Sequence, residues 1–122
     1  MSDQIQRLYQ AVLDAQGRDP NASRTAKLLT EGTAKMAKKL AEEAVEVGLD
    51  AVQGNREATI RESADLIYNL AVLWAECGIT PDDVYAEMDR REQMLGIAEK
   101  LPKNQVHNLD RDLARLKKLV KG

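Results

Sequence analysis

The chain has 122 residues, enough for one domain with a hydrophobic core, and its charged residues (31%) greatly exceed its aromatic ones (3%). This balance favours helices over a β-sandwich or barrel, and a net charge of −2 excludes the basic field that draws proteins to nucleic acid. The single cysteine, Cys77, excludes an intramolecular disulfide framework and is typical of the cytoplasm. Because the N-terminus has no secretory pattern and no apolar stretch could span a bilayer, a membrane partner is not expected.

Hydrophobic periodicity and helix-breaking residues predict an all-α fold of four or five helices. A short first helix containing Leu8 and Val12 is followed by a loop, after which Ser23 or Thr25 can cap the next segment. Two long helices are then expected, over about 33–53 and about 56–77.

Pro81 is placed at the first position of a further helix, which we expect to reach about Leu95. A linker and a basic amphipathic C-terminal helix are predicted within 96–122. The pattern contains no credible strand, and we expect a single domain over 1–122.

The two long central helices are apolar over much more than the usual third of their circumference. A lone chain of four or five helices offers too little surface to bury them on several sides. We therefore expect a homodimer whose interface completes the core of the bundle.

Each central helix also carries a narrow acidic stripe. Glu43 and Glu46 are three residues apart on the first, and Glu62 and Asp65 have the same spacing on the second, so each pair lies on one helical face. Such a stripe is often only the solvated side of a helix. Here the stripes are mostly of one sign and border apolar surface, where an unpaired carboxylate is costly. These features favour a divalent-cation site.

The composition of this cluster indicates which metal would suit it. Carboxylate oxygens are the ligands that Mg²⁺ or Mn²⁺ prefers, whereas zinc and iron more often recruit His or Cys. A di-iron bundle would need Glu-x-x-His on two helices. The only histidine, His107, lies outside both acidic segments, which excludes that site.

The segments SRTAKLLTEGTAKMAKKLAEEAVEVGLDAV and ESADLIYNLAVLWAECGITPDDVYAEMDRR resemble the phosphoribosyl-ATP pyrophosphatases of histidine biosynthesis. This family belongs to the all-α, MazG-like nucleoside triphosphate pyrophosphatases, whose pattern is Glu-Glu-x-x-Glu followed by Glu-x-x-Asp. The pattern corresponds here to Glu42, Glu43, Glu46, Glu62 and Asp65. The resemblance covers about 23–91 and implies the all-α pyrophosphatase fold.

The resemblance further implies a Mg²⁺-dependent dimer that hydrolyses phosphoribosyl-ATP to phosphoribosyl-AMP and pyrophosphate. Its implied metal ligands are Glu43, Glu46, Glu62 and Asp65. The implied catalytic residues are Glu42 and Glu43, with Glu42 either a further ligand or the group that activates the attacking water.

Four other residues are candidates for substrate binding. Lys39 could contact a phosphate oxygen or form an i,i+4 ion pair with Glu43. Arg24 and Lys27 could reach the ribose phosphate or simply be solvated surface. Asn69 could order a neighbouring carboxylate or touch the base.

Two positions depart from the family pattern and leave the substrate open. The family usually has His where this chain has Asn69, and often an aromatic residue where it has Arg24. One alternative is a house-cleaning pyrophosphatase of the same fold that acts on another nucleotide. A catalytically silent helical dimer is the other, but retention of all five acidic residues argues against it.

Overall fold

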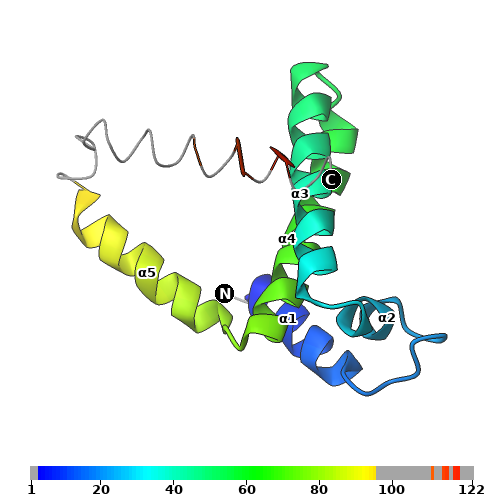
Figure 1. Ribbon diagram of the computed structural model, residues 1–122. Coiled ribbons are helices and arrows are strands. Elements are labelled where there is room, and N and C mark those ends of the chain that lie inside the picture. Colours follow the sequence, from blue (N-terminus) through cyan, green and yellow to red (C-terminus); the bar gives the residue numbers. More distant parts are fainter. Residues whose placement is uncertain (1–2, 96–110, 112–113, 116, 119–122) are drawn as a thin grey trace. The chain divides into compact units, whose positions relative to one another are not determined.

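Figure 1 shows the computed structural model of the chain, which describes residues 3–95, 111, 114–115 and 117–118. Within these residues the regular structure is helical and no strand occurs. The helices are α1 (Gln4–Ala15), α2 (Arg24–Thr30), α3 (Thr33–Val52), α4 (Arg56–Cys77) and α5 (Pro81–Gln93). The predicted all-α fold is confirmed, and the two central helices begin and end within one residue of the predicted positions.

The chain divides into two compact units, Met1–Pro81 and Asp82–Gly122. The first contains α1 to α4, and α5 falls almost wholly in the second. Most of the linker and C-terminal helix predicted within 96–122 lies outside the described residues. The single domain expected over 1–122 stays a prediction. No helix in the described part of the chain combines the length and apolar character needed to cross a membrane.

The turn between α3 and α4 makes these two helices antiparallel neighbours. Gly54 adopts a φ of +73°, a left-handed conformation that glycine reaches without strain, and its N–H donates to Ala51 O over 3.1 Å. Asn55 then caps α4, because its side-chain oxygen accepts from the backbone N–H of Ala58 at 3.1 Å. The break that the sequence predicts between helices over about 33–53 and about 56–77 is confirmed.

The short helix α2 is anchored at its first turn. Of the two predicted capping residues, Ser23 is the cap, with its hydroxyl accepting from the N–H of Ala26 at 3.1 Å. The Thr25 hydroxyl instead shares a 2.7 Å hydrogen bond with the hydroxyl of Tyr68 on α4. This bond ties the beginning of α2 to the middle of the longest helix.

The hydrophobic core of the first unit lies at one end of the α3–α4 hairpin. Figure 1 shows α1 and α2 gathered where α3 begins and α4 ends, and contacts join α1 and α2 to α4. The buried cluster consists of Val12, Leu28, Met36, Ala71 and Val72.

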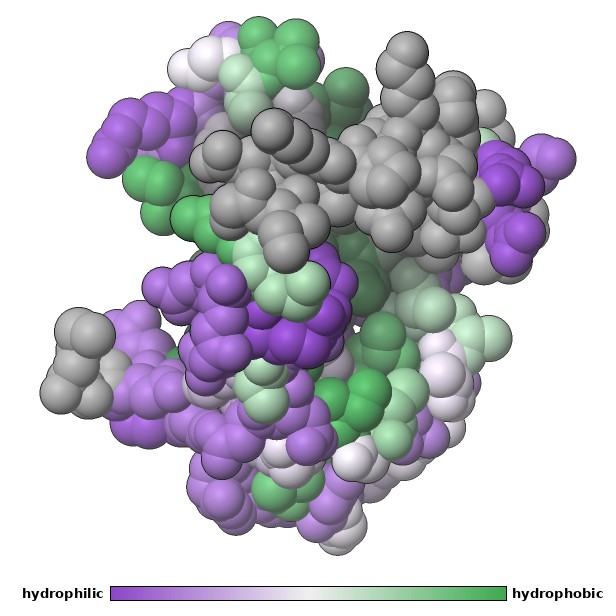
Figure 2. All heavy atoms as spheres, turned by 90° about the vertical axis from the view of Figure 1, so that its left-hand side faces the viewer, coloured by the Kyte–Doolittle hydropathy of each residue, from purple (hydrophilic) through white to green (hydrophobic). Residues whose placement is uncertain are grey.

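The opposite end of the hairpin leaves apolar side chains in solvent. Leu49 is 57% exposed, Val52 is 88% exposed, and Ile60 is also uncovered. Val45 and Ile67 are exposed as well, nearer the middle of the two helices. Figure 2 shows apolar surface at the top of the view, the level at which Figure 1 places the turn between α3 and α4. We call the uncovered apolar residues Val45, Leu49, Val52, Ile60 and Ile67 the hairpin patch.

Truncating Met36 should measure how far the fold depends on the core. Met36 is 1% exposed, and Met36→Ala is expected to lower the free energy of unfolding by about 2–5 kcal/mol through lost burial and a cavity. The same change at Met88 on α5, which is 59% exposed, should alter it by no more than about 0.5 kcal/mol. Urea denaturation of both variants checks this, and equal losses would contradict the assigned core.

Candidate metal-binding site

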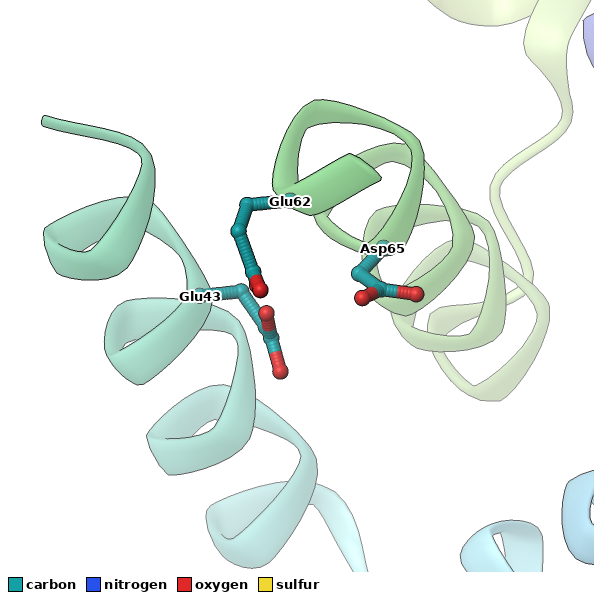
Figure 3. A group of neighbouring side chains, drawn as sticks. All are labelled: Glu43, Glu62 and Asp65. Atoms are coloured by element: carbon teal, nitrogen blue, oxygen red, sulfur yellow. The ribbon is translucent and has the colours of Figure 1, made fainter. Parts of the chain in front are cut away.

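Three carboxylates from the two central helices converge on one point. Glu43 reaches it from α3, and Glu62 and Asp65 reach it from adjacent turns of α4. One oxygen of each lies within 4.8 Å of the others, and Figure 3 shows the three side chains directed toward the space between the helices. Three of the four predicted metal ligands are therefore brought together.

The fourth predicted ligand, Glu46, is coupled to this group through Glu62. Hydrogen bonding with the Glu62 carboxyl raises the pKa of Glu46 above its ordinary value. Glu46 is solvent-exposed and lies three residues after Glu43 on α3. It therefore sits at the rim of the group. We call Glu43, Glu46, Glu62 and Asp65 the carboxylate cluster.

The electrostatics of the cluster indicate a need for a proton or a cation. Hydrogen bonding with Glu43 raises the pKa of Glu62, and the negative charges of Glu43 and Asp65 add to the effect. Glu43 Oε2 is buried and has no hydrogen-bond partner among the described residues. A carboxylate oxygen that is withdrawn from water without a donor is the kind of atom that a bound cation satisfies.

The remaining predicted residues on α3 and α4 differ in how far they are buried. Glu42 is exposed and lies outside the group of three converging carboxylates. Lys39 is half-buried on α3, and the ion pairs of the described residues do not include the alternative Lys39–Glu43 pair. Asn69 is buried, one turn beyond Asp65 on α4.

Arg24 and Lys27 are both exposed on α2. The Arg24 guanidinium lies 5.9 Å from the centre of the Tyr68 ring, within the range of a cation–π contact. Together with the bond between Thr25 and Tyr68, this contact holds the first turn of α2 against α4. The sequence pattern did not identify Thr25 and Tyr68 as a pair, since a tyrosine at helical spacing indicates only a core position.

The raised pKa of Glu62 predicts how pH acts on the metal-free protein. A carboxyl whose pKa is raised on folding favours the folded state at low pH, and this contribution is lost as the pH rises above 4.5 through the raised pKa. In the presence of a chelator, the melting temperature of the wild type minus that of Glu62→Gln should therefore fall as the pH rises through this range. Glu76→Gln, an exposed carboxyl on the same helix, serves as the control and should run parallel to the wild type. If the melting temperatures of Glu62→Gln and the wild type change in parallel with pH, the result would contradict the crowding of carboxylates around Glu62.

Comparison with known proteins identifies the family. Residues 5–92 match the family model described as phosphoribosyl-ATP pyrophosphohydrolase. A protein of Rhodopseudomonas palustris named phosphoribosyl-ATP pyrophosphatase 2 is 67% identical over 106 residues, which cover 87% of this chain and 81% of the relative. Its namesake in Bradyrhizobium diazoefficiens is 64% identical, over 85% of this chain and 78% of the relative.

A more distant relative, the phosphoribosyl-ATP pyrophosphatase of Gluconobacter oxydans, is 49% identical over 79% of this chain and 72% of the relative. The family model spans the carboxylate cluster and every predicted substrate-binding residue. The resemblance drawn from the sequence is confirmed. The chain belongs to the phosphoribosyl-ATP pyrophosphohydrolase family.

Proposed function

We propose that the chain hydrolyses phosphoribosyl-ATP to phosphoribosyl-AMP and pyrophosphate in histidine biosynthesis. Its family membership and the names of its relatives support this substrate. The observation that carries the proposal is the convergence of Glu43, Glu62 and Asp65 from two helices to within 4.8 Å. A triphosphate is itself negatively charged, so it cannot approach these carboxylates unless a positive charge compensates the repulsion. The cytoplasm is the proposed location.

Mg²⁺ is the proposed cofactor, with Mn²⁺ as a possible substitute. The donor set fits, because it consists of carboxylate oxygens and includes Oε2 of Glu43, which is buried and has no partner in the described part of the chain. Glu43, Glu62 and Asp65 would hold the ion between the helices, with Glu46 at the rim. When bound, a divalent ion there would neutralise phosphate charge and polarise a water molecule.

Hydrolysis also requires a group that accepts a proton. As the water oxygen forms its bond to phosphorus, the anhydride bond breaks and the water must lose a proton. Glu42 is exposed, adjacent to Glu43 and outside the converging group, so it is free to receive that proton. We therefore favour Glu42 as the general base over a fifth ligand.

Positive side chains are available to bind the phosphates. Lys39 lies one turn before Glu43, is half-buried, and forms no ion pair within the described part of the chain. We assign it to a phosphate oxygen of the substrate. Arg24 and Lys27 are assigned to the ribose phosphate. Tyr68 supports this assignment, because it holds Arg24 and the first turn of α2 in place.

A homodimer is part of the proposal. The hairpin patch exposes five large apolar side chains, and exposed apolar surface of this kind often marks an interface, while α1 and α2 lie at the other end of the hairpin. Pairing the patch with its copy in a second chain would bury Leu49 and Val52 and complete the core. Because α3 and α4 also carry the carboxylate cluster, dimerisation would stiffen the site.

A house-cleaning pyrophosphatase acting on another nucleotide is the alternative. It is favoured by Arg24, which lies on the Tyr68 ring at a position where the family often has an aromatic residue. The two functions share the fold and the cluster and differ only in the substrate.

Rates of pyrophosphate release test the proposed substrate. Purified protein is given phosphoribosyl-ATP and a panel of ordinary and modified nucleoside triphosphates, each with Mg²⁺. The highest kcat/KM is expected for phosphoribosyl-ATP. A higher value for any other triphosphate would replace the proposed function with the alternative.

Removing one charge from the cluster should abolish activity without unfolding the chain. Glu43→Gln and Asp65→Asn keep the size of each side chain. Loss of a group that merely supports a metal ligand lowers activity by about 10–100-fold, and loss of a ligand itself should lower kcat by more than that. The matched control is Glu76→Gln, which should retain wild-type kcat. Circular dichroism checks that helicity is preserved. Normal turnover by either cluster variant would exclude that residue as a ligand.

A charge placed in the hairpin patch should break the dimer. Leu49→Asp puts a carboxylate into the proposed apolar interface, where its desolvation is unfavourable. Analytical ultracentrifugation is expected to show a dimer for the wild type and a monomer for Leu49→Asp at the same concentration. Ala22→Asp, an equivalent change in the exposed loop before α2, should remain dimeric. A monomeric wild type would remove the dimer from the proposal.

A further inference from the structure

Within the part of the chain that the structure describes, Asn69 is the only buried polar residue, and its exposed fraction is 2%. Its amide nitrogen donates to the backbone carbonyl of Asp65, four residues earlier, at 2.8 Å. Because a carbonyl can only accept, this bond fixes which end of the amide is the nitrogen. The other end, Oδ1, is buried and has no hydrogen-bond partner among the residues that the structure describes.

A buried acceptor with no donor lowers the stability of the folded chain. The next residues of α4 inward from Asn69 include Ala71 and Val72, both fully buried and apolar. An apolar side chain of similar size at position 69 would extend this core without leaving an unmet hydrogen bond. The amide is therefore unfavourable for the stability of the ligand-free protein. Its presence at position 69 must be explained by a hydrogen bond that forms in another state of the protein.

Position 69 lies between the carboxylate cluster and the core. Glu62, Asp65, Asn69 and Val72 follow one another at spacings of three and four residues and so share one face of α4. Helical side chains lean toward the N-terminus, which directs the Asn69 amide toward the Asp65 turn. The Asn69 side chain is therefore bonded to the turn that carries Asp65, one turn from the cluster on the side of the core.

We infer that Asn69 is a positioning residue for the carboxylate cluster. Its N–H holds the turn of α4 that carries Asp65, and its free Oδ1 accepts a hydrogen bond from an N–H or O–H donor that arrives with the bound state. That donor belongs either to a water held by a divalent cation or to the nucleotide. Only the nucleotide source rests on the proposed function.

Asn69→Leu tests the inference, since it is close in size and removes both polar atoms. In the presence of a chelator, the melting temperature of Asn69→Leu should exceed that of the wild type by a few degrees, because the buried oxygen without a hydrogen bond has been removed. Its kcat/KM for phosphoribosyl-ATP should fall by roughly 10–100-fold, the range for outer partners of metal ligands. Asn69→Ala is measured beside it, so that a leucine too large for the site does not decide the result.

A matched control exists on the same helix. The Ser63 hydroxyl donates to the Thr59 carbonyl at 2.6 Å, which is also a side-chain bond to the backbone four residues earlier. Ser63→Ala should leave kcat/KM near the wild-type value. A loss there equal to that of Asn69→Ala would attribute both effects to the shape of α4 and overturn the inference.

Titration with Mn²⁺ alone distinguishes the two donors without any nucleotide. Weaker Mn²⁺ binding by Asn69→Ala identifies a cation-held water, whereas unchanged Mn²⁺ binding with a raised KM identifies the nucleotide. The inference is overturned if Asn69→Ala keeps both the wild-type Mn²⁺ affinity and the wild-type kcat/KM. If the wild type does not hydrolyse phosphoribosyl-ATP, the proposed function fails separately, and Mn²⁺ affinity alone then decides the role of Asn69.

Discussion

Repulsion among carboxylates that face one another across α3 and α4 is the constraint on which the site depends. Apolar helix packing draws the carboxyl groups of Glu43 and Glu62 together, and hydrogen bonding with Glu43 together with nearby negative charge raises the pKa of Glu62. Helix packing supplies the stability that offsets this repulsion. The same juxtaposition creates affinity for a small, hard cation, because only a cation satisfies several carboxylate oxygens at once.

The packing that opposes this repulsion is unevenly distributed along the hairpin. Around Met36 the helices are covered by α1 and α2, while near Leu49 and Val52 they are bare. The cluster lies between these two ends. The proposed dimer would close the bare end, so that the site is supported from both sides. Under this account, assembly and cation binding are linked, because each makes the other less costly.

Much of this arrangement could be predicted from the sequence. Gly54-Asn55 marks the turn between α3 and α4, and the three-residue spacings put each acidic pair on one helical face. Periodicity describes single helices, however, and not the rotation of one helix against another. It therefore could not separate Glu43, which enters the group, from its neighbour Glu42, which stays outside. Nor could it show that the Asn69 oxygen lacks a donor among the described residues, since hydrogen bonding in a core depends on contacts between elements.

The melting temperature of the metal-free protein, measured with and without millimolar Mg²⁺, tests the central claim most directly. A ligand that binds only the folded state raises the stability of that state in proportion to its affinity. The account predicts a rise with Mg²⁺ that Glu43→Gln removes, because the ion relieves the repulsion held between α3 and α4. An unchanged melting temperature, with or without nucleotide, would contradict the assignment of the carboxylate cluster as a cation site.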